Sequence, residues 1–239
     1  MRLIPLFFLL VGFTLGQVKR PVDEGETEAG LARLTVINHA SFMIENGPLV
    51  IHVDPVGVNR YEGLPQADVI LITHTHGDHL DPAAVAKLRK EGTLVIGPEA
   101  AAKSVPGLTV LRNGESRQVG ATGFEAVPAY NTPKAAGGGQ IFHPKGEGNG
   151  YILTFGGLRC YIAGDTQAIP EMAALKNITV AFLPMNQPFT MTPEELAAAA
   201  RSFSPRILYP YHSRGSDTAA LVKLLEGSGI DVRIRDWYY

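Results

Sequence analysis

The run Thr73–His79, which reads THTHGDH, places three histidines and one aspartate within six residues. Imidazole nitrogens and carboxylate oxygens are the ligands that borderline divalent ions such as zinc accept. Gathering so many of them at one bend is costly unless a cation compensates. The alternative is a polar turn with coincidental histidines, but only 7 of the 239 residues are histidine. The run therefore predicts a metal site, with candidate ligands His74, His76, Asp78 and His79.

Three further candidate ligands lie later in the chain. Asp165 and His212 each follow a predicted strand, and His143 lies in a glycine-rich stretch. Each is a weak signal alone, because an aspartate after a strand is commonly a helix cap and an isolated histidine is commonly a core or surface residue. Loops at strand ends can aim side chains from a rigid scaffold. Together with the histidine run, these residues predict one site.

The elements that must position these ligands begin with predicted strands and continue with strands alternating with helices. The continuous apolar run Asp68–Thr73 is typical of a strand buried on both faces, and it ends in the histidine run. Asp81 and Pro82 predict the start of a helix reaching about Lys90. The remaining strands are expected over residues 33–38, 41–45, 49–54, 93–97, 108–111, 118–129, 151–155, 159–163, 179–183, 206–209 and 231–235, and the remaining helices over 98–103, 170–176, 192–203 and 217–226.

The segment Tyr130–Gly150 contains six glycines and two prolines and shows little periodicity. Loops of this length without regular structure are usually functional or disordered. We expect it to fold over the site as a lid that carries Tyr130, Asn131 and Lys145. Lys145 is either a contact for an anionic group or simply a solvated lysine.

Composition limits the class of protein. The length and apolar content suit a single domain over residues 31–239. A formal net charge of −2, without basic blocks, disfavours a nucleic-acid partner, so a small-molecule substrate is expected. The oligomeric state is left open. Cys160 is the single cysteine and is expected to be a small buried residue.

The beginning of the chain has the pattern of an export signal. Arg2 precedes the uncharged apolar stretch Leu3–Leu15, and residues 14–16 resemble a cleavage site. The stretch is short for a membrane span, although an uncleaved anchor is the alternative. We expect a signal peptide over residues 1–16, a polar tether over residues 17–30, and a periplasmic or secreted protein without other membrane contact.

The order of the motifs resembles the metallo-β-lactamase superfamily of hydrolases over nearly all of the chain from about residue 33. In that family a carboxylate after an early strand precedes HxHxDH, a lone histidine, a lone aspartate and a final histidine. The resemblance implies an α/β (α+β) fold, a four-layer αββα sandwich with the site along one edge of its two sheets. The corresponding residues here are Asp54, the run 74–79, His143, Asp165 and His212.

The resemblance also implies two divalent ions, with zinc as the default and manganese, iron or nickel as alternatives. Asp54 is expected to orient the histidine loop without binding metal. The implied ligand sets are His74, His76 and His143 for one ion, and Asp78, His79 and His212 for the other, with Asp165 bridging both.

Several phrases are similar to the branch that contains ascorbate-6-phosphate lactonase, among them Asn38–Phe42 and Phe142–Gly146. His39 is then expected near the metal centre, as a substrate contact or a hydrogen-bond donor to a ligand; the alternative is a purely structural role. His52 has no motif around it and is expected on the surface.

The implied activity is hydrolysis of a small ester, lactone or phosphodiester by a hydroxide bound to two metals. Asp78 is expected to steer the water or shuttle its proton. The alternatives are a phosphodiesterase similar to the N-acylphosphatidylethanolamine phospholipase branch, and an exported metal-binding protein without turnover.

Three relatives with other activities are disfavoured. The di-zinc β-lactamases lack a bridging aspartate of the Asp165 kind. Oxygen- or nitric-oxide-reducing relatives replace a ligand of the first histidine pair, whereas His74 and His76 are both present here. Nucleic-acid-processing relatives carry an additional substrate-binding arm.

Overall fold

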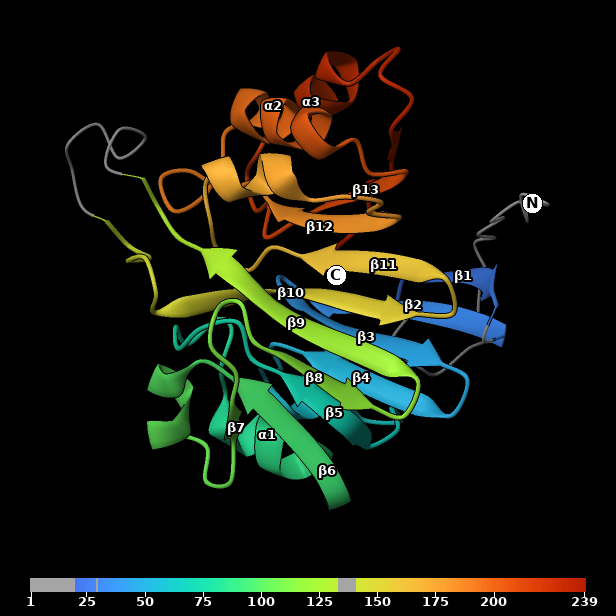
Figure 1. Cartoon of the computed structure of the whole chain (residues 1–239), viewed down its shortest axis with the longest axis vertical. Coiled ribbons are helices and arrows are strands. Elements are labelled where there is room, and N and C mark those ends of the chain that lie inside the picture. The colour runs from blue at the N-terminus through green and yellow to red at the C-terminus, as the bar shows by residue number, and fades with distance from the viewer. Residues whose placement is uncertain (1–19, 29, 133–140) are drawn as a thin grey trace.

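The computed structural model describes residues 20–28, 30–132 and 141–239. The predicted signal peptide and the centre of the glycine-rich loop lie outside these described residues. Two β-sheets pack face to face, and helices cover the outer face of each sheet (Figure 1). This arrangement confirms the four-layer αββα sandwich.

The N-terminal sheet contains seven strands, which lie side by side in the order of the sequence. Neighbouring strands are antiparallel from the first to the fourth and parallel from the fourth to the seventh. The strands are β1 (Val22–Thr27), β2 (Gly30–Asn38), β3 (Ser41–Asn46), β4 (Leu49–Val53), β5 (Ala67–Leu71), β6 (Arg89–Gly97) and β7 (Thr109–Val110).

The C-terminal sheet repeats this topology. Its seven strands also follow the sequence order, with three antiparallel pairings and then three parallel ones. The two halves therefore form a structural duplication that no sequence repeat indicated. The strands are β8 (Ser116–Val119), β9 (Thr122–Ala129), β10 (Gly148–Phe155), β11 (Leu158–Ile162), β12 (Val180–Pro184), β13 (Ile207–Tyr211) and β14 (Asp231–Val232).

The helices of the described chain connect the parallel strands, because such strands need a crossover. Asp81 caps α1 by accepting from the Ala83 amide, as expected from the sequence. α2 begins with a capping box between Thr192 and Glu195. None of these helices is long and apolar enough to cross a bilayer. The helices are α1 (Pro82–Leu88), α2 (Pro193–Phe203), α3 (Thr218–Leu224), and the 3-10 helices η1 (Val58–Tyr61), η2 (Glu99–Lys103) and η3 (Pro170–Ala174).

An apolar core between the sheets holds the two halves together. Phe42 of β3 stacks on Phe182 of β12 with 4.4 Å between ring centroids, and Phe182 stacks on Tyr209 of β13 at 5.1 Å. Burying each such ring stabilises the fold by roughly 1.5–3 kcal/mol. Cys160 is buried in the same core, as predicted. These contacts between the two sheets fix the position of one sheet relative to the other.

The first strand corrects the predicted polar tether. Residues 22–27 form β1, which pairs with β2 instead of leading flexibly into the domain. Its inward-facing side chain is Asp23, which is buried and accepts from both Arg235 and Tyr209. A buried ion pair thus takes the place of the alternating apolar residues by which a strand is normally recognised.

Two further expectations were wrong. Residues 148–150, expected in a loop, belong to β10, and Gly150 allows close strand packing because a Cβ there would lie 3.0 Å from the Ala163 carbonyl. His52, expected on the surface, is fully buried. Its Nε2–H donates to the Pro65 carbonyl at 3.0 Å and its ring packs on Tyr61. Burial lowers the pKa of His52 to about 4.

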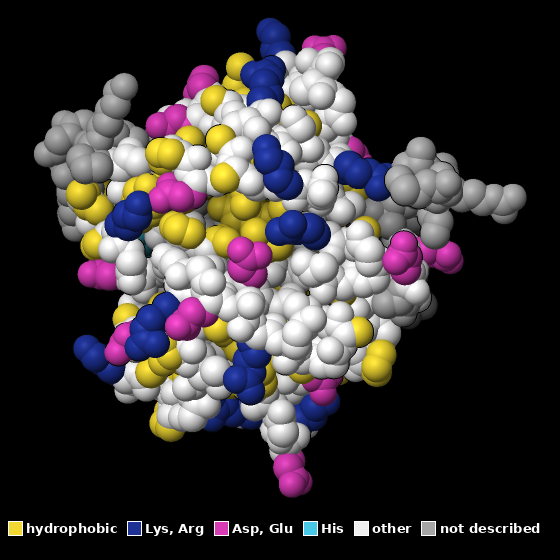
Figure 2. Space-filling view, in the orientation of Figure 1, with side chains coloured by type: hydrophobic (Ala, Val, Ile, Leu, Met, Phe, Trp, Pro, Cys, Tyr) yellow, Lys and Arg dark blue, Asp and Glu magenta, His cyan; other side chains and the backbone are white. Residues whose placement is uncertain are grey.

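The outer face of the C-terminal sheet is covered only in part. In Figure 2 apolar side chains line a hollow across the middle of this face. It has a volume of about 280 Å³ and is lined by residues that include Val127, Ile152, Ile169 and Leu175. Very little histidine is visible on this face.

Strand ends from both sheets meet at one edge of the sandwich. Asp54 follows β4 and Asp165 follows β11, and these two strands are the fourth of their respective sheets. The histidine run follows β5, and His212 follows β13. Because the carboxyl ends of parallel strands share one edge, the topology gathers these side chains.

Candidate metal centre

The run 73–79 forms a tight turn at the end of β5. The backbone amides of His79 and Leu80 both donate to the His76 carbonyl at 2.9 Å. This turn directs three imidazoles and the Asp78 carboxylate toward the edge between the sheets.

The predicted ligands lie together in space. Within each of three groups, the candidate ligand atoms lie within 4.8 Å of one another. The first group matches the first expected set, and the second matches the other expected set with His39 added. The third joins Asp165 to one histidine of each set. The groups are His74, His76 and His143; His39, Asp78, His79 and His212; and His74, His79 and Asp165.

Asp165 lies at the centre of the cluster. Its Oδ2 is 3.3 Å from His143 Nε2, 3.3 Å from His212 Nε2 and 3.8 Å from His74 Nε2. Its Oδ1 is 3.3 Å from His79 Nε2. The carboxylate therefore faces members of both expected sets, which is the position required of a bridging ligand.

The donor atoms of this cluster fit a cation. The Nε2 atoms of His74, His79, His143 and His212 are buried and make no hydrogen bond, and neither does Asp165 Oδ1. Buried polar atoms without partners are rare and costly. One or more divalent ions among them would satisfy all of these atoms with ligand types that such ions accept.

Two charge states of the site suit metal binding. Burial, reinforced by the neighbouring His79, lowers the pKa of His74 well below its ordinary value. Burial alone would raise the pKa of Asp165, but the facing imidazoles of His79 and His212 hold that pKa well below its ordinary value. A neutral imidazole and an ionised carboxylate are the forms that coordinate metal. At His79, burial is outweighed by the carboxylates of Asp165 and Asp54, which raise the pKa well above its ordinary value, so an ion bound there would displace a proton.

Asp54 orients the centre from behind, as expected. It is fully buried, and its Oδ2 accepts from His79 Nδ1 at 2.8 Å. With the proton held on Nδ1, the Nε2 lone pair of His79 would be available to an ion bound next to Asp165. A carboxylate behind a ligand histidine fixes its tautomer and ring orientation in this way.

Thr73 extends this orientation to His74. Its Oγ1–H donates to Asp54 Oδ2 at 2.6 Å, and its backbone amide donates to Asp54 Oδ1 at 2.7 Å. Since the single hydroxyl proton is used, Oγ1 is an acceptor for His74 Nδ1–H at 3.0 Å. The Nε2 lone pair of His74 is then directed into the site.

Asn131 performs the same task for His143. Its Oδ1 accepts from the backbone amide of His143 at 2.9 Å and from His143 Nδ1 at 3.0 Å. The sequence placed Asn131 in a lid, whereas the structure shows it beneath a candidate ligand. Lys145 does not stand free, because its ammonium pairs with Glu171 at 2.8 Å.

His39 lies beside the second set. Its Nε2 is 3.1 Å from Asp78 Oδ2 and its Nδ1 is 2.9 Å from the Tyr238 hydroxyl. With the Tyr238 hydroxyl donating to Nδ1, the Nε2–H of His39 donates to the Asp78 carboxylate. The guanidinium of Arg214 lies 4.7 Å from the centre of the Tyr238 ring.

The backbone at the site is held in unusual conformations. His39, Asp54 and His212 have positive φ values of 53°, 43° and 47°. Such conformations cost on the order of 1–3 kcal/mol each and persist where the surrounding structure imposes them. Gly164, with φ of 65°, permits a close approach, since a Cβ there would lie 2.8 Å from the Asn149 carbonyl.

Sequence reasoning gave no site role to Thr73 or Tyr238, and no correct one to Asn131. Thr73 stood inside the histidine run, but nothing in the pattern distinguished its hydroxyl from that of Thr75. Tyr238 is 199 residues from His39 along the chain, so no local signal could connect them.

A family model described as the beta-lactamase superfamily domain matches residues 33–212. This chain belongs to the beta-lactamase superfamily. Among its relatives is a UPF0173 metal-dependent hydrolase of Geobacillus sp. (strain WCH70), which is 33% identical over 194 residues, or 75% of this chain and 84% of the relative. The chain is therefore a metal-dependent hydrolase of the metallo-β-lactamase fold.

Two solved structures are similar to this chain. A candidate metal-dependent hydrolase from Parabacteroides distasonis is 48% identical and superposes with a TM-score of 0.85, covering 91% of this chain and 99% of the other. Igni18, a metallo hydrolase from Ignicoccus hospitalis, shares the fold with a TM-score of 0.71 at 22% identity, over 87% of this chain and 96% of its own.

Proposed function

We propose that this superfamily member is a binuclear metal-dependent hydrolase that cleaves a small ester, lactone or phosphodiester. The observation that carries the proposal is the Asp165 carboxylate, which faces imidazoles of both ligand sets. A carboxylate between two adjacent sites can bind an ion in each of them. The expected ligands are His74, His76 and His143 for one ion and Asp78, His79 and His212 for the other.

Two divalent ions, zinc by default, would supply Lewis acidity and a water of lowered pKa to such a site. The chain supplies orientation. Asp54 and Thr73 hold the tautomers of His79 and His74, and Asn131 holds that of His143. Because these partners are buried, the ligand geometry is preorganised before substrate arrives.

Asp78 is the ligand candidate best placed to meet substrate. Its side chain is 50% exposed, whereas that of Asp165 is 2% exposed. The neighbouring imidazoles of His212 and His39 hold the pKa of Asp78 below its ordinary value, so it is ionised at neutral pH. The ionised Asp78 carboxylate can accept a hydrogen bond from an attacking water and so orient it, and His39 Nε2–H steadies the carboxylate from its other side.

The proposal is tested with metal-replete protein and three generic substrates: a 4-nitrophenyl ester, a γ-lactone and a bis-4-nitrophenyl phosphate. We expect two metal ions per chain by elemental analysis and turnover of at least one substrate class. His76→Ala should lose one ion and most of the activity, because His76 is the exposed member of the first set. Unchanged activity in that variant would refute the metal mechanism.

The same experiment separates the alternatives. Turnover of the phosphodiester alone supports the phosphodiesterase assignment. Full metal content without turnover of any substrate supports a metal-binding protein without catalysis.

We further propose export of this hydrolase, on the basis of Arg2 and the apolar stretch Leu3–Leu15. The near-neutral charge supports a small-molecule substrate over a nucleic acid. N-terminal sequencing of the protein from its native host should find a start near Gln17, and a start at the first residue would contradict cleavage.

A further inference from the structure

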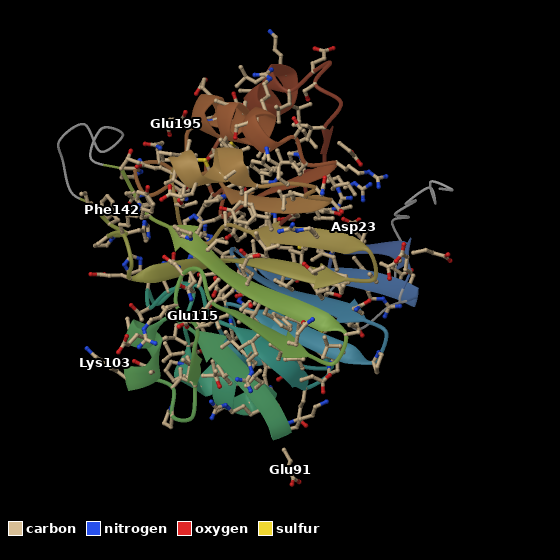
Figure 3. The ribbon with its side chains drawn as sticks, in the orientation of Figure 1. Asp23, Glu91, Lys103, Glu115, Phe142 and Glu195 are labelled. Carbon is tan, nitrogen blue, oxygen red and sulfur yellow. The ribbon has the colours of Figure 1, made fainter. Side chains whose placement is uncertain are left out.

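An aromatic pair stands at the rim of the candidate metal centre. Phe142 lines the same cavity as His74, His143 and Asp165. The ring of Phe189 lies 4.8 Å from that of Phe142 between centroids, at an angle of 67°. Figure 3 shows Phe142 at the side of the molecule next to the arrowhead of β9, where strand ends meet. We call Phe142 and Phe189 the aromatic rim.

The aromatic rim is open to solvent at Phe189, whereas Phe142 is half-buried. Phe189 is 40% exposed, and Ile141, next to Phe142 in the chain, is 39% exposed. A single exposed apolar side chain needs no explanation, but apolar side chains gathered at one cavity commonly mark a binding surface. Here they adjoin the ligands of a candidate catalytic centre.

The position of the aromatic rim is fixed relative to the metal ligands. Asn131 Nδ2 donates to the Phe189 carbonyl at 2.9 Å, while its Oδ1 accepts from His143. The turn that carries Phe189 is closed by Asn186 and Thr190, whose backbone amides donate to Thr190 Oγ1 at 2.7 Å and to the Asn186 carbonyl at 2.8 Å. A group resting on Phe189 is therefore held at a set distance from His143.

The charges near the aromatic rim do not attract an anion, and Glu147 lines the same cavity. Lys145 follows the aromatic rim in sequence, but its ammonium is paired with Glu171 and lies over the Tyr130 ring. What the rim itself presents is aromatic carbon. Such a surface is suited to an alkyl or aryl group and gives little attraction to a carboxylate or phosphate.

We propose that the aromatic rim is a specificity subsite that binds an apolar alkyl or aryl group of the substrate next to the bond that is cleaved. This inference rests on the proposed hydrolase function, which it refines toward substrates with an apolar group. In ester hydrolysis, a carbon–oxygen bond to water forms and the acyl carbon–oxygen bond to the alcohol breaks. One water proton passes through a base to the leaving oxygen, so that the carboxylic acid and the alcohol are released. The apolar group on the acyl side is unchanged by this reaction.

The test uses 4-nitrophenyl acetate, butanoate and hexanoate, with metal content checked for every variant. Full burial of a methylene contributes roughly fourfold in affinity, so a half-open rim should contribute about twofold in kcat/KM for each one. We expect wild type to show this increase and Phe189→Ala to lose it, with the acetate rate within about twofold of wild type. Phe189→Leu should keep much of the increase, and Phe142→Leu tests the second ring.

Val222→Ala is the matched control, because Val222 is 44% exposed on α3, away from the cavity. It should leave the chain-length dependence unchanged. Equal kcat/KM for all three esters in wild type, or a dependence that survives in both Phe189→Ala and Phe142→Leu, would overturn the inference and leave the hydrolase function intact.

Binding of the products gives a second measurement that does not require turnover. Hexanoate should bind metal-replete protein at least tenfold more tightly than acetate by calorimetry, and Phe189→Ala should abolish the difference. If no ester is cleaved but this difference is found, the proposed ester hydrolysis fails while the subsite stands. If hexanoate and acetate bind equally, the subsite is refuted.

Discussion

Replacing Thr73 with valine tests whether the buried hydroxyl sets the tautomer of a metal ligand. Valine has nearly the same shape as threonine, so Thr73→Val removes the hydroxyl without opening a cavity. The hydroxyl donates to the Asp54 carboxylate at 2.6 Å and accepts from His74 Nδ1 at 3.0 Å. Both contacts are buried, so water cannot replace them.

The magnitude follows from these two contacts. A hydrogen bond to a charged group contributes about 1.5–3 kcal/mol, and a buried N–H without an acceptor costs about 1–3 kcal/mol. His74 can avoid the second cost by moving its proton to Nε2, which then blocks the lone pair needed for metal. We therefore expect Thr73→Val to lose about 3 kcal/mol of unfolding free energy and 10–100-fold in metal affinity.

The measurement is zinc affinity by competition with a chromophoric chelator, together with urea unfolding of the metal-free protein. Thr73→Ser is the control, because serine keeps the hydroxyl and loses one methyl group, which costs about 1 kcal/mol. Its zinc affinity should stay within about threefold of wild type. Wild-type zinc affinity in Thr73→Val, or an equal loss in both variants, would refute the tautomer argument.

Three other predictions concern stability. Gly164→Ala should lower the free energy of urea unfolding by about 3 kcal/mol, since φ is 65° and the new Cβ would meet the Asn149 carbonyl. Gly63→Ala is the control, because Gly63 also has a positive φ but has open space around it, and its loss should be about 1 kcal/mol. Burial lowers the pKa of His52 to about 4, against about 6.5 in the unfolded chain. The unfolded chain therefore takes up a proton first, and the free energy of unfolding should fall by up to about 3 kcal/mol between pH 6.5 and pH 4. In His52→Gln the free energy of unfolding should fall less over this range. Asp23→Asn should lose about 3 kcal/mol in thermal or urea unfolding by leaving Arg235 unpaired, and a loss below 1 kcal/mol would show that the buried pair is not needed.

The fold was largely predictable because most of its strands carry local signals. The apolar run before the histidines gave β5, and the capping residues gave the starts of α1 and α2. β1 escaped prediction because its buried side chain is an aspartate whose partner, Arg235, lies 212 residues away. The burial of His52 was not predicted for a similar reason. Its hydrogen-bond partner is the backbone carbonyl of Pro65, and every residue has such a carbonyl, so residue type does not reveal the partner.

The candidate ligands themselves were named from sequence. The short spacing of the histidine run gave four of them, and the order of motifs, by its resemblance to the superfamily, added His143, Asp165 and His212. The groups that orient those ligands were not named from sequence. Thr73, Asn131 and Tyr238 act through hydrogen bonds whose geometry depends on how strand ends meet. Hydroxyl and amide side chains are common throughout the chain, so residue type alone does not single them out.

From the sequence alone, the order of the motifs indicated the superfamily by resemblance, and that resemblance implied the four-layer architecture. Residue chemistry gave the candidate metal ligands, because few side-chain types hold divalent ions. Only the tertiary structure decided how the ligand imidazoles face Asp165, that His39 donates to Asp78 of the second set, and that an aromatic rim borders the cavity. These features arise where the two sheets meet at a shared edge. Their geometry depends on contacts between residues that are far apart in the sequence, so no single segment of the chain predicts it.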